Sequence, residues 1–91
     1  MKIYIAGKIT GVLDPAKLFN AAAQRLRAEG HEVMNPSILP EGFEQHEYLK
    51  ICFAMIDVCD AIYMLNNWED SLGANKEIKY ATCQNKEVQY E

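Results

Sequence analysis

Short apolar runs alternate with longer amphipathic stretches along the chain, and this alternation constrains the fold more than any other feature. The runs 2–6 and 60–65 are rich in strand-forming residues and almost continuously apolar, as in strands covered on both faces. Two shorter strand-forming runs occupy residues 31–34 and 87–90. Strands that alternate with helices predict an α/β domain with a parallel sheet.

The stretches between these runs have the apolar spacing of helices. The expected helices span residues 15–28, 44–57 and 71–84. Asp14 is expected to cap the first helix ahead of Pro15, and Gly30 to end it. Pro36 ends the second strand, because proline donates no hydrogen bond to a neighbouring strand.

Short right-handed crossovers between these elements predict a flavodoxin-like, Rossmann-like three-layer sandwich. We expect one domain over residues 1–91, with three helices and four parallel strands in the order second, first, third, fourth. Ligands of such sheets bind beyond the carboxyl ends of the strands. The loops at residues 7–11, 35–42 and 66–71 are therefore expected to surround one site.

Charge and hydropathy exclude several partners. Nine basic and thirteen acidic residues give a net charge of -4 without a basic cluster, which argues against a nucleic-acid polymer. No apolar run approaches the roughly 18 residues of a membrane span, and the apolar start is broken at Gly7, too early for a signal peptide. We therefore expect a cytoplasmic protein that does not bind membranes.

The cysteines and histidines predict neither disulfides nor a metal site. Cys52, Cys59 and Cys83 are odd in number and lie in apolar segments, so buried reduced thiols are expected. His31 and His46 are far apart in the sequence and have no companion ligands beside them.

Residues capable of binding or chemistry meet at the predicted site. Lys8 and Thr10 lie between two glycines, a weak phosphate-loop pattern that is neither a Walker loop nor a dinucleotide fingerprint. Ser71 and Gly73 begin the third helix, whose electropositive N-terminus suits an anion, although a serine there most often only caps the helix. Glu77 follows within the second turn, and its usual alternative is a solvated helix face.

Four short motifs occur in order on the expected elements. They are Ile3-Tyr4-Ile5-Ala6-Gly7, Asn35-Pro36, Cys59-Asp60-Ala61, and Asn67-Trp68-Glu69-Asp70-Ser71-Leu72-Gly73-Ala74 with Glu77 and Ala81. Together they resemble the nucleoside 2-deoxyribosyltransferase superfamily, particularly its small bacterial and phage members, over nearly the whole chain. The resemblance implies cleavage or transfer at the N-glycosidic bond of a 2'-deoxynucleoside or its 5'-monophosphate, with no metal or organic cofactor.

The resemblance also assigns roles to residues. In the superfamily the acidic residue matching Glu77 attacks the anomeric carbon and the tyrosine matching Tyr4 orients it; a carboxylate can trap an oxocarbenium-like centre as a glycosyl-enzyme. The position of Ser71 is usually an aspartate in the transferases and a phosphate-holding serine in the 2'-deoxynucleoside 5'-monophosphate N-hydrolases, so Ser71 favours a nucleotide. The expected substrate-binding residues are Gly7, Lys8, Thr10, Asn35, Trp68, Ser71 and Gly73.

The chain departs from these relatives in two ways. They carry an aspartate that assists the departing base eight residues before the position of Asp60, where this chain has Cys52. A thiol, with an ordinary pKa of about 8.5 that burial raises, is a poor substitute, and Asp57 should point roughly 140° away. The sequence also stops after the fourth strand, so we expect a less enclosed pocket and a homodimer or larger assembly, with Trp68 and Phe43 as lids, dimer contacts or plain packing.

Three functions remain open on the sequence alone. The first is an N-glycosidic-bond enzyme, a deoxyribosyltransferase or N-hydrolase, that uses Glu77. The second is a nucleotide-binding module that has lost the chemistry, for which Cys52 is the motivating residue. The third is a structural or protein-interaction role, which predicts no pocket lined by Tyr4, Ser71 and Glu77.

Overall fold

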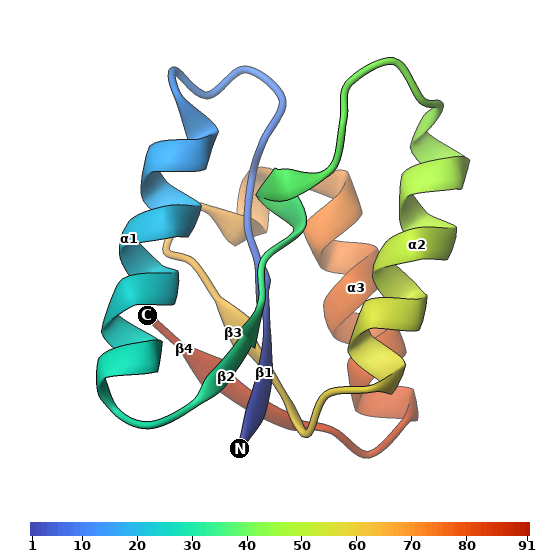
Figure 1. The fold of residues 1–91 in the computed structure, drawn as a ribbon. Helices are drawn as coiled ribbons and strands as arrows, with labels where there is room; N and C mark the ends of the chain where they lie inside the picture. The colour runs from blue at the N-terminus through green and yellow to red at the C-terminus, as the bar shows by residue number, and fades with distance from the viewer.

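Four parallel strands form the centre of the computed structural model, which describes residues 1–91 (Figure 1). The strands are β1 (Lys2–Ala6), β2 (Glu32–Met34), β3 (Ala61–Met64) and β4 (Glu87–Tyr90). Their order is β2-β1-β3-β4, and every neighbouring pair is parallel. The predicted fold class and strand order are confirmed.

Three helices cover the two faces of the sheet. They are α1 (Pro15–Ala28), α2 (Gln45–Asp57) and α3 (Leu72–Cys83). Figure 1 shows α1 on one side of the sheet and α2 with α3 on the other. Two short 3-10 helices, η1 (Pro36–Ile38) and η2 (Trp68–Asp70), lie within the segments expected to be loops. None of the helices is long and apolar enough to cross a membrane.

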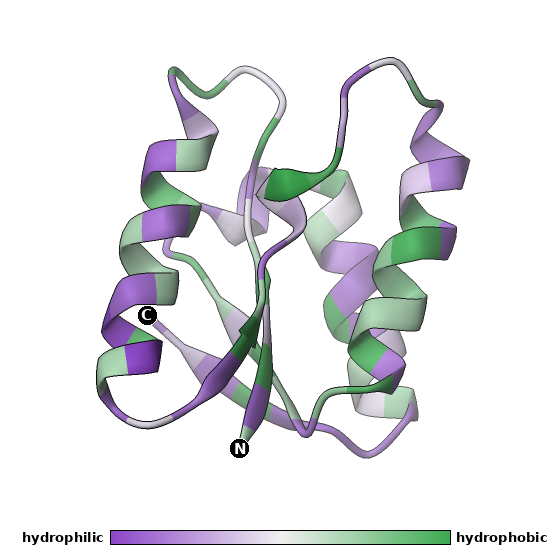
Figure 2. Cartoon of the chain, viewed as in Figure 1, coloured by the Kyte–Doolittle hydropathy of each residue, from purple (hydrophilic) through white to green (hydrophobic).

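The core forms two layers because successive residues of a strand point to opposite faces. Ile3 and Ile5 of β1 belong to the cluster that contains the buried side chains of α1, whereas Tyr4 and Ala6 belong to the cluster that contains those of α2 and α3. β1 is therefore buried on both faces, as its continuous apolarity predicted. Figure 2 shows that each helix carries both hydrophilic and hydrophobic residues, as expected for helices that cover a sheet.

The helix ends show which local predictions hold. Gly30 ends α1 as predicted, with a φ of +93°, and Asn85 ends α3 with a φ of 60°. Asp14 is the N-cap residue of α1 and Pro15 begins the helix, as predicted, but the Asp14 side chain makes no capping hydrogen bond and its φ is 51°. A capping side chain reaches the helix from an extended backbone, and Asp14 has a left-handed one.

The cysteines are all free, and two of the three are buried as expected. Cys52 and Cys59 lie in the core layer beneath α2 and α3. The expected burial of Cys83 is wrong, because this residue occupies an exposed position in the last turn of α3.

Candidate functional site

A cleft of about 790 Å³ opens at the carboxyl edge of the sheet. The loops that follow β1, β2 and β3 supply much of its wall, and the start of α1, one face of α2, the first two turns of α3 and Tyr4 of β1 supply the rest. The three loops expected to surround one site therefore do so.

Three buried side chains from three elements meet in this cleft. Tyr4 of β1 is fully buried, and its hydroxyl donates a hydrogen bond of 3.1 Å to Oε2 of Glu77 on α3. Cys52 of α2 lies beside both groups and is 5% exposed. Glu77 is 9% exposed, so its alternative placement on a solvated helix face is excluded.

Burial shifts the acid-base behaviour of Glu77 toward neutrality. Removal of the carboxyl group from water raises its pKa from the ordinary 4.5 to about 7, although the hydrogen bond from Tyr4 and the neighbouring Cys52 thiol lower the pKa in part. A carboxyl group with this pKa is partly ionised near pH 7 and retains little solvation. The site therefore contains a desolvated carboxylate that the Tyr4 hydroxyl holds in place.

The same environment makes Tyr4 and Cys52 weak acids. Burial, assisted by the charge of Glu77, raises the pKa of Tyr4 well above its ordinary value. Burial is also the main cause that raises the pKa of Cys52 to about 12. Asp57 lies outside the cleft, where its carboxylate accepts a hydrogen bond of 2.6 Å from the Tyr80 hydroxyl. Neither Cys52 nor Asp57 is thus suited to protonate a departing base.

The N-terminus of α3 borders the cleft with free hydrogen-bond donors. Oγ of Ser71 accepts a hydrogen bond of 3.1 Å from the amide of Ala74, so Ser71 caps the helix, and its O–H can still donate. The amides of Leu72 and Gly73 have no partner within the helix, as the first turn requires. A Cβ at Gly73 would lie 3.0 Å from Nε2 of Gln45, so a larger residue would disturb this wall.

The loop after β1 forms the neighbouring wall. Gly7, Lys8 and Thr10 all line the cleft, and Lys8 is the one cationic residue among the lining residues. A Cβ at Gly7 would lie 2.8 Å from Cδ1 of Leu65, so only glycine fits this position without movement of the core. The amide of Lys8 donates a hydrogen bond of 2.9 Å to Oδ1 of Asn67, which joins this loop to the loop after β3.

Asn35 and Trp68 are not among the residues that line the cleft, so their contact with substrate stays a prediction. Nδ2 of Asn35 donates a hydrogen bond to Oδ1 of Asn20, and Oδ1 of Asn35 accepts one from the backbone amide of Ser37, both at 2.9 Å. Asn35 is buried, so these bonds satisfy it and position η1. Trp68 packs against the core cluster below α2 and α3, because burial of an aromatic side chain stabilises the fold more than exposure at the rim of the cleft does.

Sequence reasoning missed several lining residues. They are Leu39, Pro40, Glu41, Gln45, Tyr48, Leu49 and Asp70. The hydroxyl of Tyr48 donates to the carbonyl of Pro40 at 2.7 Å and accepts from the amide of Phe43 at 3.2 Å, so Tyr48 holds the loop before α2. Helical spacing makes a residue such as Tyr48 indistinguishable from a core residue, and no local signal identifies it.

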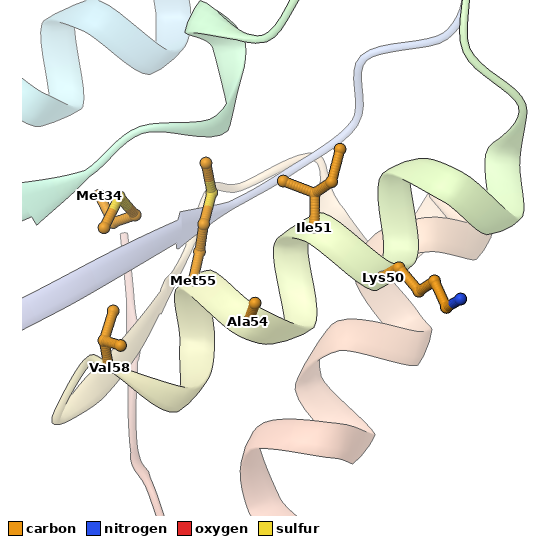
Figure 3. Close-up of a pocket in the computed structure, with 6 residues that line it drawn as sticks. All are labelled: Met34, Lys50, Ile51, Ala54, Met55 and Val58. Carbon is orange, nitrogen blue, oxygen red and sulfur yellow. The ribbon is translucent and has the colours of Figure 1, made fainter.

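A second hollow, between α2 and the end of β2, carries no chemistry (Figure 3). Met34, Ile51, Ala54, Met55, Val58 and Lys50 line it. Figure 3 shows the Lys50 side chain directed away from the other five. No group of three or more His, Cys, Asp or Glu side chains lies close enough to hold a metal ion. The cleft with Glu77 is therefore the candidate active site.

Comparison with known proteins identifies one solved structure with a similar fold and one matching family. A solved structure, "2-desoxiribosyltransferase from Leishmania mexicana", superposes with a TM-score of 0.73 and 22% sequence identity over 98% of this chain. The chain spans 62% of the length of that structure. The likeness shows that the two proteins share a fold, and no curated protein matches the chain significantly. A family profile matches residues 1–90, and the chain belongs to that family, described as "Domain of unknown function (DUF4406)".

Proposed function

We propose that the chain cleaves or transfers the N-glycosidic bond of 2'-deoxynucleosides or their 5'-monophosphates, with Glu77 as the nucleophile. The buried contact of 3.1 Å between the Tyr4 hydroxyl and the Glu77 carboxylate, in the wall of the cleft, is the observation that carries this proposal. The fold that the chain shares with a 2-desoxiribosyltransferase supports the same class of reaction.

The proposed reaction has two steps at the anomeric carbon of the sugar. An oxygen of Glu77 forms a bond to this carbon while the bond to the base breaks, and the electron pair of that bond leaves with the base. Water or a second base then displaces Glu77 and regenerates the carboxylate. The Tyr4 hydroxyl, which donates to Oε2, orients the carboxylate for attack. A pKa of about 7 leaves enough ionised Glu77 near neutral pH for the first step.

The donors around the mouth of α3 favour a substrate with a 5'-phosphate. The Ser71 hydroxyl and the amides of Leu72 and Gly73 lie at the positive end of the helix dipole. Lys8, in the loop after β1, adds a positive charge to the same cleft. A phosphate bound between them would leave the sugar near Glu77, which follows on the same helix.

Base release from a panel of deoxynucleosides and their 5'-monophosphates tests this proposal. We expect the parent to release base and Glu77→Gln to lose at least about a hundredfold in rate, because the amide cannot form the glycosyl-enzyme. Glu32→Gln is the matched control: Glu32 is exposed and does not line the cleft, so its variant should keep the parental rate. Equal rates for Glu77→Gln and the parent would show that Glu77 is not the nucleophile.

A second candidate is a nucleotide-binding module without turnover. The raised pKa of Cys52, about 12, favours it, since this thiol cannot readily protonate a departing base. Calorimetric titration with the same compounds separates the two functions, because binding without base release supports the module. If the protein neither binds the compounds nor releases base from them at millimolar concentration, both functions are contradicted. A purely structural role predicts no pocket lined by Tyr4, Ser71 and Glu77, whereas all three line the cleft.

A further inference from the structure

Asn75, in the second turn of α3, connects its side chain to the segment that leads into the helix. Its Nδ2 donates to the carbonyls of Ser71 at 2.7 Å, Glu69 at 3.1 Å and Trp68 at 3.4 Å. Since Nδ2 carries two hydrogens, the bonds to Ser71 and Glu69 are the main ones and the longer contact with Trp68 shares a hydrogen with one of them. Asn75 is itself outside the set of residues that line the cleft.

These bonds hold a turn whose backbone groups face the cleft. The carbonyl of Ser71 accepts from the backbone amide of Asn75 at 3.0 Å as well as from its Nδ2, so the peptide unit between Ser71 and Leu72 has its N–H on the opposite side. The amide of Ala74 is already bonded to Oγ of Ser71, so the free donors of this turn are the amides of Leu72 and Gly73 and the Ser71 O–H. Each of these three residues lines the cleft.

The held segment also touches the facing loop. Asn67, just before η2, accepts the hydrogen bond from the amide of Lys8. A shift of the segment that Asn75 holds would therefore move the loop that carries Lys8 as well. The distance between Lys8 and the N-terminus of α3 therefore depends on the turn that Asn75 holds.

We propose that Asn75 is a positioning residue of the cleft: it holds the turn before α3 so that the Ser71 hydroxyl and the amides of Leu72 and Gly73 converge on the phosphate of the ligand. The proposal rests on the proposed function, in that the ligand is taken to be a 5'-monophosphate. By this role, Asn75 helps the cleft to bind a nucleotide more tightly than the corresponding nucleoside, although Asn75 itself contacts neither molecule.

Asn75→Ala tests this, because alanine favours the helix and adds no charge that would itself repel an anion. Calorimetry should show affinity for a 2'-deoxynucleoside 5'-monophosphate about tenfold lower than in the parent, the loss expected for one or two misplaced donors to a charged group. Affinity for the free nucleoside should stay within about twofold. Thr82→Ala is the control, since it removes a side-chain hydrogen bond to a carbonyl of the same helix, Thr82 Oγ1 to Ile78 at 2.8 Å, away from the cleft.

Inorganic phosphate alone gives a readout that does not depend on the proposed reaction. In nuclear magnetic resonance titrations of the parent, the amide signals of Leu72 and Gly73 should shift with phosphate, and Asn75→Ala should need several times more phosphate for the same shift. Parental phosphate binding without base release would contradict only the proposed reaction.

Three results would overturn the role of Asn75. They are unchanged nucleotide affinity in Asn75→Ala, equal losses for nucleotide and nucleoside, and no response of the parental amides to phosphate. If Asn75→Ala does not fold, Asn75→Ser keeps one shorter donor and should show an intermediate loss for phosphate, and parental phosphate affinity in that variant would equally overturn the role.

Discussion

Glu77→Gln should make the protein more stable than the parent above neutral pH, but no more stable in mild acid. Glu77 is 9% exposed, and burial raises its pKa from the ordinary 4.5 to about 7. The folded protein therefore disfavours the ionised carboxylate that the proposed reaction requires. An amide at this position has nearly the same shape and no charge to desolvate.

The size of the effect follows from the two pKa values. Below about pH 4.5 the carboxyl group is protonated in the folded and unfolded states, so Glu77 adds no pH dependence there. As pH rises from 4.5 to about 7, the unfolded chain loses the proton first, and the free energy of unfolding falls. At about 1.4 kcal/mol for each pKa unit, the parent loses roughly 3 kcal/mol that Glu77→Gln keeps.

Urea unfolding followed by circular dichroism, at about pH 8 and about pH 4.5, measures this difference. Other carboxyl groups are common to both proteins, so their contributions cancel when the variant is compared with the parent at each pH. Glu69→Gln provides the control, because the Glu69 side chain is exposed and its loss should give the same difference at both pH values. In thermal unfolding, the gain at about pH 8 corresponds to a melting temperature higher by on the order of 10 °C.

The pH dependence of the difference in unfolding free energy between Glu77→Gln and the parent shows whether burial raises the pKa of Glu77. If Glu77→Gln differs from the parent by the same free energy at both pH values, the Glu77 carboxylate is not strained by burial. If Glu77→Gln is less stable relative to the parent at about pH 8 than at about pH 4.5, the hydrogen bond from Tyr4 outweighs desolvation, and the pKa of Glu77 lies below its ordinary value rather than above it.

Three other measurements test further features of the structure. Tyr4→Phe removes the donor to Glu77 and should move the pH dependence of base release upward by about one to two units, since a hydrogen bond to a charged group contributes roughly 1.5 to 3 kcal/mol; an unchanged profile would contradict the contact. Gly7→Ala places a Cβ 2.8 Å from Cδ1 of Leu65 and should cost about 1 to 3 kcal/mol in urea unfolding, unless Leu65 moves freely. Light scattering should give at least twice the mass of one chain; a monomeric parent would contradict the expected assembly.

The elements could be predicted because their signals are local. β1 and α1 begin and end at the predicted residues, since apolar spacing, Pro15 and Gly30 act within a few residues of themselves. Strand order followed from the handedness and shortness of the crossovers, which leave few arrangements of four parallel strands. Asp14 lacks a capping hydrogen bond because a backbone conformation, rather than a residue type, decides whether a side-chain cap forms.

The site was harder to predict, because its contacts join residues that are distant in the sequence. Tyr4 and Glu77 are 73 positions apart, and on the sequence alone only the family resemblance paired them. Asn35 and Trp68 occur in the motifs of that resemblance, yet one is satisfied by Asn20 and Ser37 and the other packs on the core. Motif membership does not determine the direction in which a side chain points.

The sequence by itself therefore determined the layers, the strand order and the set of loops at the carboxyl edge, because hydrophobic periodicity and short connections act locally. Only the tertiary structure decided that Glu77 is buried against Tyr4 and Cys52, so that its pKa lies near 7. It also decided that Asn75 holds the turn before α3. Desolvation and the direction of a carbonyl depend on every element packed around a group, and no short stretch of sequence contains that information.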